Sequence, residues 1–306
     1  MLNALDHVIL AVRDLDTATS DYRRLLGLAP SWSGVHPDQG TANVLFRLEN
    51  CYLELLTPMR EGPLASFLGE WLRARGDGLL GLAFATGDIE RCRASLAERG
   101  LSPGPVEAGH GRDSATGAER RWRRALLPMD RTRDVLIFPI EHDSPASALP
   151  MAHADGVAAA AVHALDHVVV QTGDGDAARA LYRDGFGLRL AVDKEFPDWG
   201  VRLMFFRVGG VTVEVAAALA GTDVAAALPG ASARAGQQRN DQRDRLYGMS
   251  YRVGDVDAAR ARLAAAGVDV SEVRKGRRPD TRVFTARGST CGVPTLMIEH
   301  EENHDR

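Results

Sequence analysis

Two histidines and two glutamates occur at one spacing in the two halves of this chain. His7 and Glu54 lie in apolar segments of the first half, and His167 and Glu214 follow them after 160 residues. A packed core needs only apolar residues of suitable size, so this polar pair, kept twice in apolar segments, indicates a polar site. An imidazole and a carboxylate can transfer protons or bind a divalent metal ion. The alternative, that each histidine is a hydrogen-bonded core residue, stays open at this point.

The segments around these side chains repeat as well. LDHVILAVRDLDTATSDYRRLLGL at residues 5–28 matches LDHVVVQTGDGDAARALYRDGFGL at residues 165–188, and a weaker pair of segments begins at Gly81 and Gly248. Each copy opens with an apolar strand pattern, turns at a Gly or Asp step and continues as a helix, and three further strands follow in the clearest copy. The chain is therefore predicted to consist of four βαβββ units.

The ends of the repeated helices have recognisable residues. Asp16 and Asp176 stand where an N-cap acceptor is expected, and Gly27 and Gly187 stand where a left-handed C-cap ends a helix. A separate helix is predicted over residues 63–75, between the first and second units.

The alternation of side chains along a strand decides which residues share a face. In residues 5–12, His7 lies opposite the apolar row that would pack on the helix, and Glu54 does so in residues 51–56. A histidine and a glutamate are therefore expected on one concave face of each half. The closing strands at residues 135–142 and 294–300 carry Glu141 and Glu299, and a buried carboxylate needs a cation, a donor or solvent.

Length and composition indicate two ordinary globular domains. The 306 residues correspond to about two domains, and the small-residue-rich stretch near the middle predicts a first domain over 1–144, a linker over 145–160 and a second domain over 161–302. The net charge of −4 gives no reason to expect nucleic acid or a membrane as partner. Three widely spaced cysteines and an N-terminus that enters a strand pattern directly predict a cytoplasmic protein. The protein is expected to be a monomer or homodimer.

These motifs resemble the vicinal oxygen chelate superfamily, which includes glyoxalase I, bleomycin-resistance proteins and extradiol dioxygenases. The resemblance rests on the LDHV opening strand, the YLELL and VTVEV strands, the IEH closing strands and the stretch HPDQGTANVLFRLENCYLELL at residues 36–56. It implies an α+β fold of two tandem cupped, eight-stranded mixed sheets, each made from two βαβββ units with helices on the outer face.

The resemblance also implies metal ligands on the first and last strands of each unit. The implied sets are His7, Glu54 and Glu141 in the first cup and His167, Glu214 and Glu299 in the second. The family's second histidine is replaced by Gly81 and Gly248. One histidine with two carboxylates can still hold Zn, Mn, Ni, Fe or Mg ions with waters. The ion's identity stays open.

Three functions are consistent with this pattern. The leading hypothesis is a glyoxalase-type, metal-assisted lyase or isomerase of a small oxygenated molecule, in which a glutamate removes a proton beside a carbonyl. The first alternative is a non-catalytic protein that binds or sequesters a small molecule or drug. The second alternative, an extradiol-type dioxygenase, needs a second imidazole that the predicted ligand sets lack.

The second cup is expected to be the main ligand site. Aromatic walls exclude water and strengthen polar contacts, and the second half is richer in aromatic and basic residues around its predicted strands. The predicted catalytic residues are Glu214 and Glu299. The predicted substrate pocket consists of Phe196, Trp199, Phe206, Tyr251 and Arg282.

Overall fold

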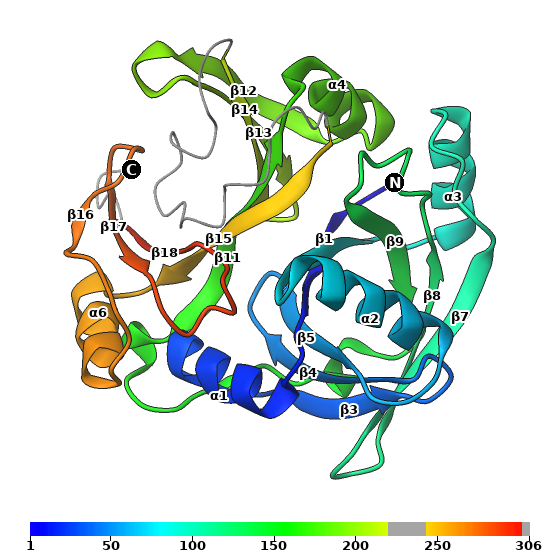
Figure 1. The fold of residues 1–306 in the computed structure, drawn as a ribbon, viewed down its shortest axis with the longest axis horizontal. Coiled ribbons are helices and arrows are strands. Elements are labelled where there is room, and N and C mark those ends of the chain that lie inside the picture. The colour runs from blue at the N-terminus through cyan, green and yellow to red at the C-terminus, as the bar shows by residue number, and fades with distance from the viewer. Residues whose placement is uncertain (220–242, 302–306) are drawn as a thin grey trace.

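The computed structural model describes residues 1–219 and 243–301, and the strands of its first half form a closed barrel (Figure 1). The elements of this half are β1 (Ala4–Ala11), α1 (Leu15–Leu26), β2 (Leu28–Ala29), β3 (Trp32–His36), β4 (Thr41–Arg47), β5 (Tyr52–Pro58), α2 (Pro63–Arg75), β6 (Gly78–Ala85), α3 (Ile89–Glu98), β7 (Val106–Asp113), β8 (Glu119–Ala125) and β9 (Leu136–His142). The barrel order is β1-β5-β4-β3-β7-β8-β9-β6.

The second half forms a curled sheet of eight strands. A connecting stretch carries η1 (Ala146–Ala148), β10 (His153–Ala154) and η2 (Ala158–Ala160). The elements of the second half are β11 (Val162–Thr172), α4 (Gly175–Arg179), η3 (Ala180–Gly185), β12 (Arg189–Phe196), η4 (Pro197–Trp199), β13 (Val201–Val208), β14 (Val211–Ala218), β15 (Arg245–Val253), α6 (Val256–Ala265), β16 (Arg274–Lys275), β17 (Thr281–Ala286) and β18 (Thr295–His300). Their order is β12-β13-β14-β11-β15-β18-β17-β16. The predicted α+β fold with two mixed sheets is confirmed.

The helix starts differ from the sequence-based expectation by two residues. Asp14 and Asp174, rather than Asp16 and Asp176, are the N-caps, and their side chains accept hydrogen bonds from the amides of Thr17 and Ala177. The two later aspartates instead lie in the first helical turn, where a negative charge favours the helix dipole. The predicted left-handed conformation of the two glycines is confirmed, since Gly27 has φ 68° and Gly187 has φ 71°.

Strand alternation separates the helix side of each sheet from its concave side. In β1, Val8 and Leu10 belong to the main apolar core, whereas Ile9 packs in a second cluster inside the barrel. Helix α2, which connects the two units of the first half, joins this inner cluster through Leu68 and Leu72 and so covers part of the barrel interior. The predicted faces of β1 are confirmed.

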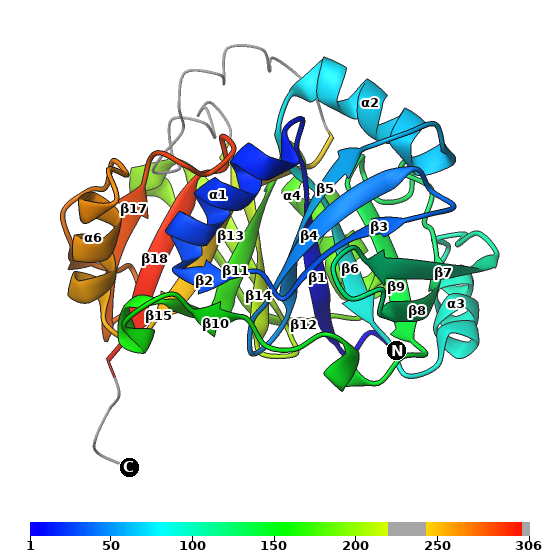
Figure 2. The ribbon, with the colours of Figure 1, turned by 90° about the horizontal axis from the view of Figure 1, so that it is seen from below.

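The two halves share the core on their helix sides. Figure 2 shows α1 beside β18, and the Tyr22 hydroxyl of α1 donates to the carbonyl of Thr290 in the second half. In the reverse direction, Phe186 after η3 lies 6.1 Å from the Phe84 ring of β6. One cluster of buried apolar residues therefore runs through both halves.

Two turns also reach from one half to the other: the β4–β5 turn of the first half and the β13–β14 turn of the second half. Asn50, between β4 and β5, donates to the carbonyl of Leu165 at 2.8 Å and accepts from its amide at 3.0 Å. The equivalent turn of the second half passes so close to β1 that a Cβ on Gly209, whose φ is 54°, would lie 2.4 Å from the Cβ of Ala4. Each half therefore braces the first strand of the other.

The domain boundaries stay a prediction that fragments 1–144 and 161–302 can test. Because the helix-side core is shared, each fragment exposes part of an apolar face. We expect each fragment to fold, to self-associate on its own and to form a one-to-one complex when the two are mixed. Circular dichroism and sedimentation velocity measure these outcomes. Two unfolded fragments would show instead that the halves fold only as one unit.

In the part of the chain that the structure describes, none of the helices combines the length and the apolar character that crossing a membrane would require.

Candidate functional site

The barrel of the first half encloses a cavity of about 620 Å³. His7 and Glu54 both line it, as predicted from the alternation of β1 and β5. Helix α2 contributes Leu64 and Phe67 to its wall. The other polar and aromatic lining residues are Trp32, His36, Gln39, Asn43, Tyr52, Glu107, Arg120, Trp122, Arg124 and Phe138.

His7 is held between two carboxylates. Its Nδ1 lies 2.7 Å from Asp6 Oδ1, and its Nε2 lies 3.5 Å from Glu54 Oε2. A register shift between Leu5 and His7 leaves Asp6 without a partner in β6, and such a bulge re-aims neighbouring side chains. Burial raises the pKa of Asp6, but hydrogen bonds from His142 and His7 outweigh burial and hold this pKa well below its usual range. Asp6 is therefore an ionised group that orients the His7 ring.

Two further polar residues meet Glu54 from the neighbouring strands. Asn43 donates its Nδ2–H to Glu54 Oε1 at 2.7 Å, and His36 Nε2 lies 3.8 Å from the same oxygen. The Nδ1 of His36 lies 2.9 Å from the Thr41 hydroxyl. Burial lowers the pKa of His36 despite the nearby charge of Glu54, which favours the neutral imidazole.

Sequence reasoning missed His36 and Asn43. His36 is the last residue of β3 and is buried. Asn43 shares a face of β4 with the equally buried Thr41, and alternation along this strand was the available signal. The first cup thus contains a second imidazole that does not come from the family position at Gly81.

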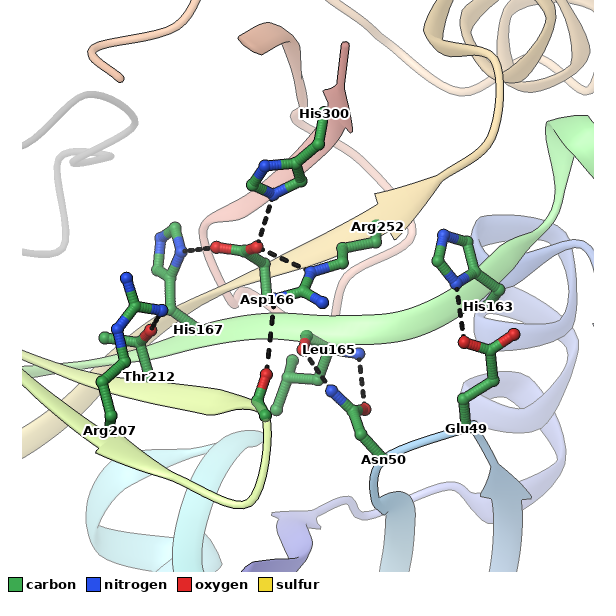
Figure 3. A network of polar contacts seen from close by, with 11 residues as sticks. Glu49, Asn50, His163, Leu165, Asp166, His167, Arg207, Thr212, Arg252 and His300 are labelled. Carbon is green, nitrogen blue, oxygen red and sulfur yellow. Dashed lines mark hydrogen bonds and ion pairs between the residues drawn. The ribbon is translucent and has the colours of Figure 1, made fainter. Parts of the chain in front are cut away.

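The second half repeats the central pair of a histidine and a glutamate. His167 Nδ1 lies 2.9 Å from Asp166 Oδ1 (Figure 3). Its Nε2 lies 3.6 Å from Glu214 Oε2. Asp166 also lies 2.7 Å from His300 Nε2 and accepts from Arg252 Nε at 2.8 Å. Burial lowers the pKa of His167, whereas Asp166 and Glu214 raise it, and the net shift is upward. The repeated unit is therefore an aspartate, a histidine and a glutamate in series.

The closing-strand glutamates lie elsewhere, which corrects the predicted ligand sets. Glu141 Oε2 accepts the amide of Ile89 at the start of α3 at 2.9 Å, and Glu299 Oε2 accepts the amide of Val256 at the start of α6 at 3.0 Å. Both carboxylates thus satisfy helix N-termini on the outer side of the sheets. The structure does not bring Glu141 together with His7 and Glu54, nor Glu299 together with His167 and Glu214.

Strand register explains this correction. In the first unit Ile9 pairs with Glu54, and in the second unit the equivalent pair is Ala83 with Phe138. Phe138, not Glu141, therefore corresponds to Glu54. In the second half Val169 pairs with Glu214, and the equivalent pair of Ser250 with Leu296 again places an apolar residue at this position.

The predicted pocket of the second cup is assembled only in part. Phe196 and Trp199 stack with ring centroids 4.9 Å apart, and Phe196 packs with the cluster on the concave face. Phe206 and Tyr251 instead belong to the core on the helix side. Arg282 pairs with Asp257 at 2.8 Å and lies 3.7 Å from Glu299, so it stands on the outer face beside α6. These last three assignments are corrected.

The donor set does not fit the metal site implied by the resemblance. Within residues 1–219 and 243–301, no three His, Cys, Asp or Glu side chains are arranged to hold a metal ion. Two of the four family positions of the first cup are Gly81 and Phe138, and Glu54 Oε1 already accepts from Asn43. We therefore assign no chemical step to a metal ion.

Elemental analysis tests this donor argument. After growth with added Zn, Mn, Ni, Fe or Mg salts, we expect much less than one divalent ion per purified chain, because His7 and Glu54 supply only two ligands from the family positions. The His7→Ala variant is expected to have the same low content. A stoichiometric ion that is lost in this variant would contradict the expectation and restore a metal-assisted site.

Comparison with known proteins identifies both halves. The model described as a glyoxalase-like domain matches residues 5–162, and the model of the glyoxalase/bleomycin resistance protein/dioxygenase superfamily matches residues 166–285. Among solved structures, a triple mutant of 4-hydroxymandelate synthase from Streptomyces coelicolor superimposes with a TM-score of 0.67 at 15% identity, covering 100% of this chain and 94% of that chain. At this identity the likeness concerns the fold alone.

Curated epimerases share sequence with part of the chain. The ethylmalonyl-CoA/methylmalonyl-CoA epimerase of Cereibacter sphaeroides is 34% identical over 117 residues, which make up 37% of this chain and 85% of that protein. The mitochondrial methylmalonyl-CoA epimerase of Homo sapiens is 40% identical over 68 residues, which make up 22% of this chain and 39% of that protein.

Proposed function

The chain belongs to the glyoxalase-like proteins of the vicinal oxygen chelate superfamily, and from this premise we propose that it is an isomerase or lyase that removes a proton beside a carbonyl group. The observation that carries the proposal is the contact between His7 and Glu54 in the wall of the first cavity. We place the reaction in the first cup because its cavity contains this pair. The sequence-based preference for the second cup stays untested.

The proposed step needs one base and one acid. Glu54 takes the proton from the carbon beside the carbonyl, and the electron pair of the broken C–H bond moves onto the carbonyl oxygen to give an enolate. The ionised Asp6 holds the His7 ring through Nδ1, and the Nε2 of this ring, beside Glu54, is the proposed partner of the enolate oxygen. Return of the proton to carbon completes an isomerisation, whereas loss of a group from the enolate completes elimination.

The surroundings of Glu54 suit this task. The side chain is buried, and the single bond from Asn43 to Oε1 fixes the carboxylate and leaves Oε2 facing His7. The aromatic and aliphatic walls limit water, which strengthens polar contacts with a bound substrate. The epimerase names of the two curated relatives agree with such a step, because inversion of a carbon beside a carbonyl can proceed by removal and return of a proton.

A non-catalytic binding protein is the second candidate. This candidate is favoured because two of the four positions that hold metal ligands in the family are Gly81 and Phe138 in the first cup, and neither offers a side chain that can bind a metal ion. In that case the cavity would hold a small molecule, and the pair of His7 and Glu54 would only fix its orientation. We do not propose the dioxygenase function, because no group of three suitable metal ligands is assembled among the described residues.

Hydrogen exchange separates the two candidates. The purified protein is incubated in D₂O with a panel of 2-oxo acids, 3-oxo acids and malonyl-type thioesters, and NMR follows the proton beside each carbonyl. We expect catalysed loss of this signal for at least one class. Binding of a panel member without exchange would favour the binding protein, and neither binding nor exchange would overturn both.

A further inference from the structure

An arginine in the wall of the first cavity has a charge that the described protein does not neutralise. Arg120 lies on β8 and is only 7% exposed. It lines the same cavity as His7 and Glu54. An arginine stays protonated in proteins, so its charge is permanently buried here. A buried charge is costly unless it is paired.

Arg120 contacts two aromatic side chains, and it also forms a side-chain hydrogen bond with one of them, Tyr52. Its guanidinium carbon lies 5.3 Å from the centroid of the Tyr52 ring and 5.8 Å from that of the Trp32 ring. Among residues 1–219 and 243–301, no carboxylate forms an ion pair with Arg120, although ion pairs are found for many other arginines of this region. Aromatic faces hold the plane of a guanidinium, and one hydrogen bond to Tyr52 leaves most of its five N–H donors available at the edge.

The second arginine of the cavity provides an internal comparison. Arg124 lies four residues along β8, and its side chain is 16% exposed. Its Nε lies 3.7 Å from Glu107 Oε2, so a carboxylate of the protein already balances its charge. The cavity therefore has one neutralised arginine and one that awaits an anion.

We infer that the first cup binds a substrate that carries a carboxylate, with Arg120 as the group that receives it. A planar carboxylate matches the paired N–H groups of a guanidinium edge and can form two parallel hydrogen bonds. The inference rests on the proposed function for the other end of the substrate molecule, where the acidic C–H group beside the carbonyl would face Glu54. The substrate class is thus a small acid with a carbonyl group, and its charge is part of recognition.

Benzoate and benzamide form a matched pair of probes, because they share shape and aromatic surface and differ in charge. Isothermal titration calorimetry at low salt is expected to show that wild-type protein binds benzoate more tightly than benzamide by on the order of tenfold to a hundredfold. Arg120→Met is expected to abolish this preference, whereas Arg124→Met, the matched control, is expected to retain it. Arg120→Lys is expected to keep part of it, since lysine retains the charge without the planar donor edge.

The site of binding is read from the indole N–H signals in NMR. Trp32 and Trp122 line the first cavity, whereas Trp199 lies in the second half. Benzoate is expected to shift the signals of Trp32 and Trp122 and to leave that of Trp199 unchanged. This measurement on the wild-type protein remains decisive if Arg120→Met does not fold.

Three outcomes would overturn the inference. The first two are equal affinity for benzoate and benzamide, and a benzoate preference that survives in Arg120→Met. The third is a benzoate-dependent shift of Trp199 alone, which would place the anion in the second half. Binding is measured without turnover, so a charge preference that depends on Arg120 stands even if no proton exchange is found. The failure of the proposed reaction and the failure of the anion site are therefore distinguishable.

Discussion

Glu54→Gln is expected to slow substrate proton exchange by roughly a hundredfold to ten-thousandfold, the usual contribution of a positioned general base. Glutamine keeps the shape of glutamate, and its side-chain oxygen can still accept the hydrogen bond that Asn43 now donates to Glu54 at 2.7 Å. The substitution removes only the ability to take a proton beside His7. Exchange rates in D₂O measured by NMR, with circular dichroism to check folding, give the result.

Glu214→Gln is the matched control for this prediction. Glu214 occupies the equivalent strand position, and its distance of 3.6 Å to His167 is close to the 3.5 Å between Glu54 and His7. We expect the exchange rate of this variant to stay within about threefold of wild type, because changes at distant sites without shared partners are coupled by only about 0.5 kcal/mol. Loss of exchange in Glu214→Gln with normal activity in Glu54→Gln would move the reaction to the second cup.

The parts of the site that sequence could predict are those that depend on local periodicity. The spacing of 160 residues paired His7 with His167, and alternation along β1 and β5 placed His7 and Glu54 on the concave face, where both line the cavity. These inferences need only a strand and its parity. The hydrogen bond of each histidine to the preceding aspartate was not predicted, because it depends on a bulge that a repeated pattern does not reveal.

The closing strands show where local reasoning fails. Glu141 lies in an apolar strand and was grouped with Glu54, but Phe138 is the residue in the equivalent register. The two positions differ by an odd number of residues, so their side chains point to opposite faces. Leu136, Phe138 and Ile140 of β9 line the cavity, so alternation along this strand places Glu141 in the outward-facing row. Its helix partner, the amide of Ile89, is a tertiary contact that sequence spacing does not encode.

Two aromatic residues predicted to line the second cup lie elsewhere for a related reason. Phe206 and Tyr251 are both fully buried, and each lies in the helix-side core shared by the two halves. A count of aromatic residues cannot distinguish a pocket wall from an interface between sheets. The shared core itself follows from how α1 and η3 pack against the opposite half, and this arrangement is set by contacts far apart in the chain.

Asp166→Ala is expected to destabilise the protein by about 3–5 kcal/mol at neutral pH, the usual cost of removing one partner from a buried charge cluster. Asp166 is buried, and its carboxylate forms hydrogen bonds with His167, His300 and Arg252 (Figure 3). The histidines can release a proton when the carboxylate is lost, but Arg252 cannot. Urea-induced unfolding followed by circular dichroism measures the difference in free energy of unfolding.

Asp6→Ala is the matched control in the first half, where His7 and His142 contact the aspartate and no arginine does so among the described residues. We expect its destabilisation to be smaller, since both imidazoles can become neutral. Equal losses of unfolding free energy in Asp6→Ala and Asp166→Ala would show that the unpaired charge of Arg252 does not cause the larger destabilisation.

The pH dependence of the Asp166→Ala difference is expected to have a maximum. Burial raises the pKa of Asp166, but its three partners outweigh burial and hold the pKa far below the ordinary 3.8, so this stabilisation is fully present above that value and is lost as the pH falls below it. The pKa of His167 is raised above 6.5, so its contribution is fully present below that value and is lost as the pH rises through the raised pKa. The free-energy difference between wild type and variant should therefore be largest between pH 3.8 and 6.5 and should decrease on both sides. Unfolding curves between about pH 2 and pH 9 include the ordinary pKa values of both groups. A difference that is constant across this range would show that packing, rather than charge, makes Asp166 important.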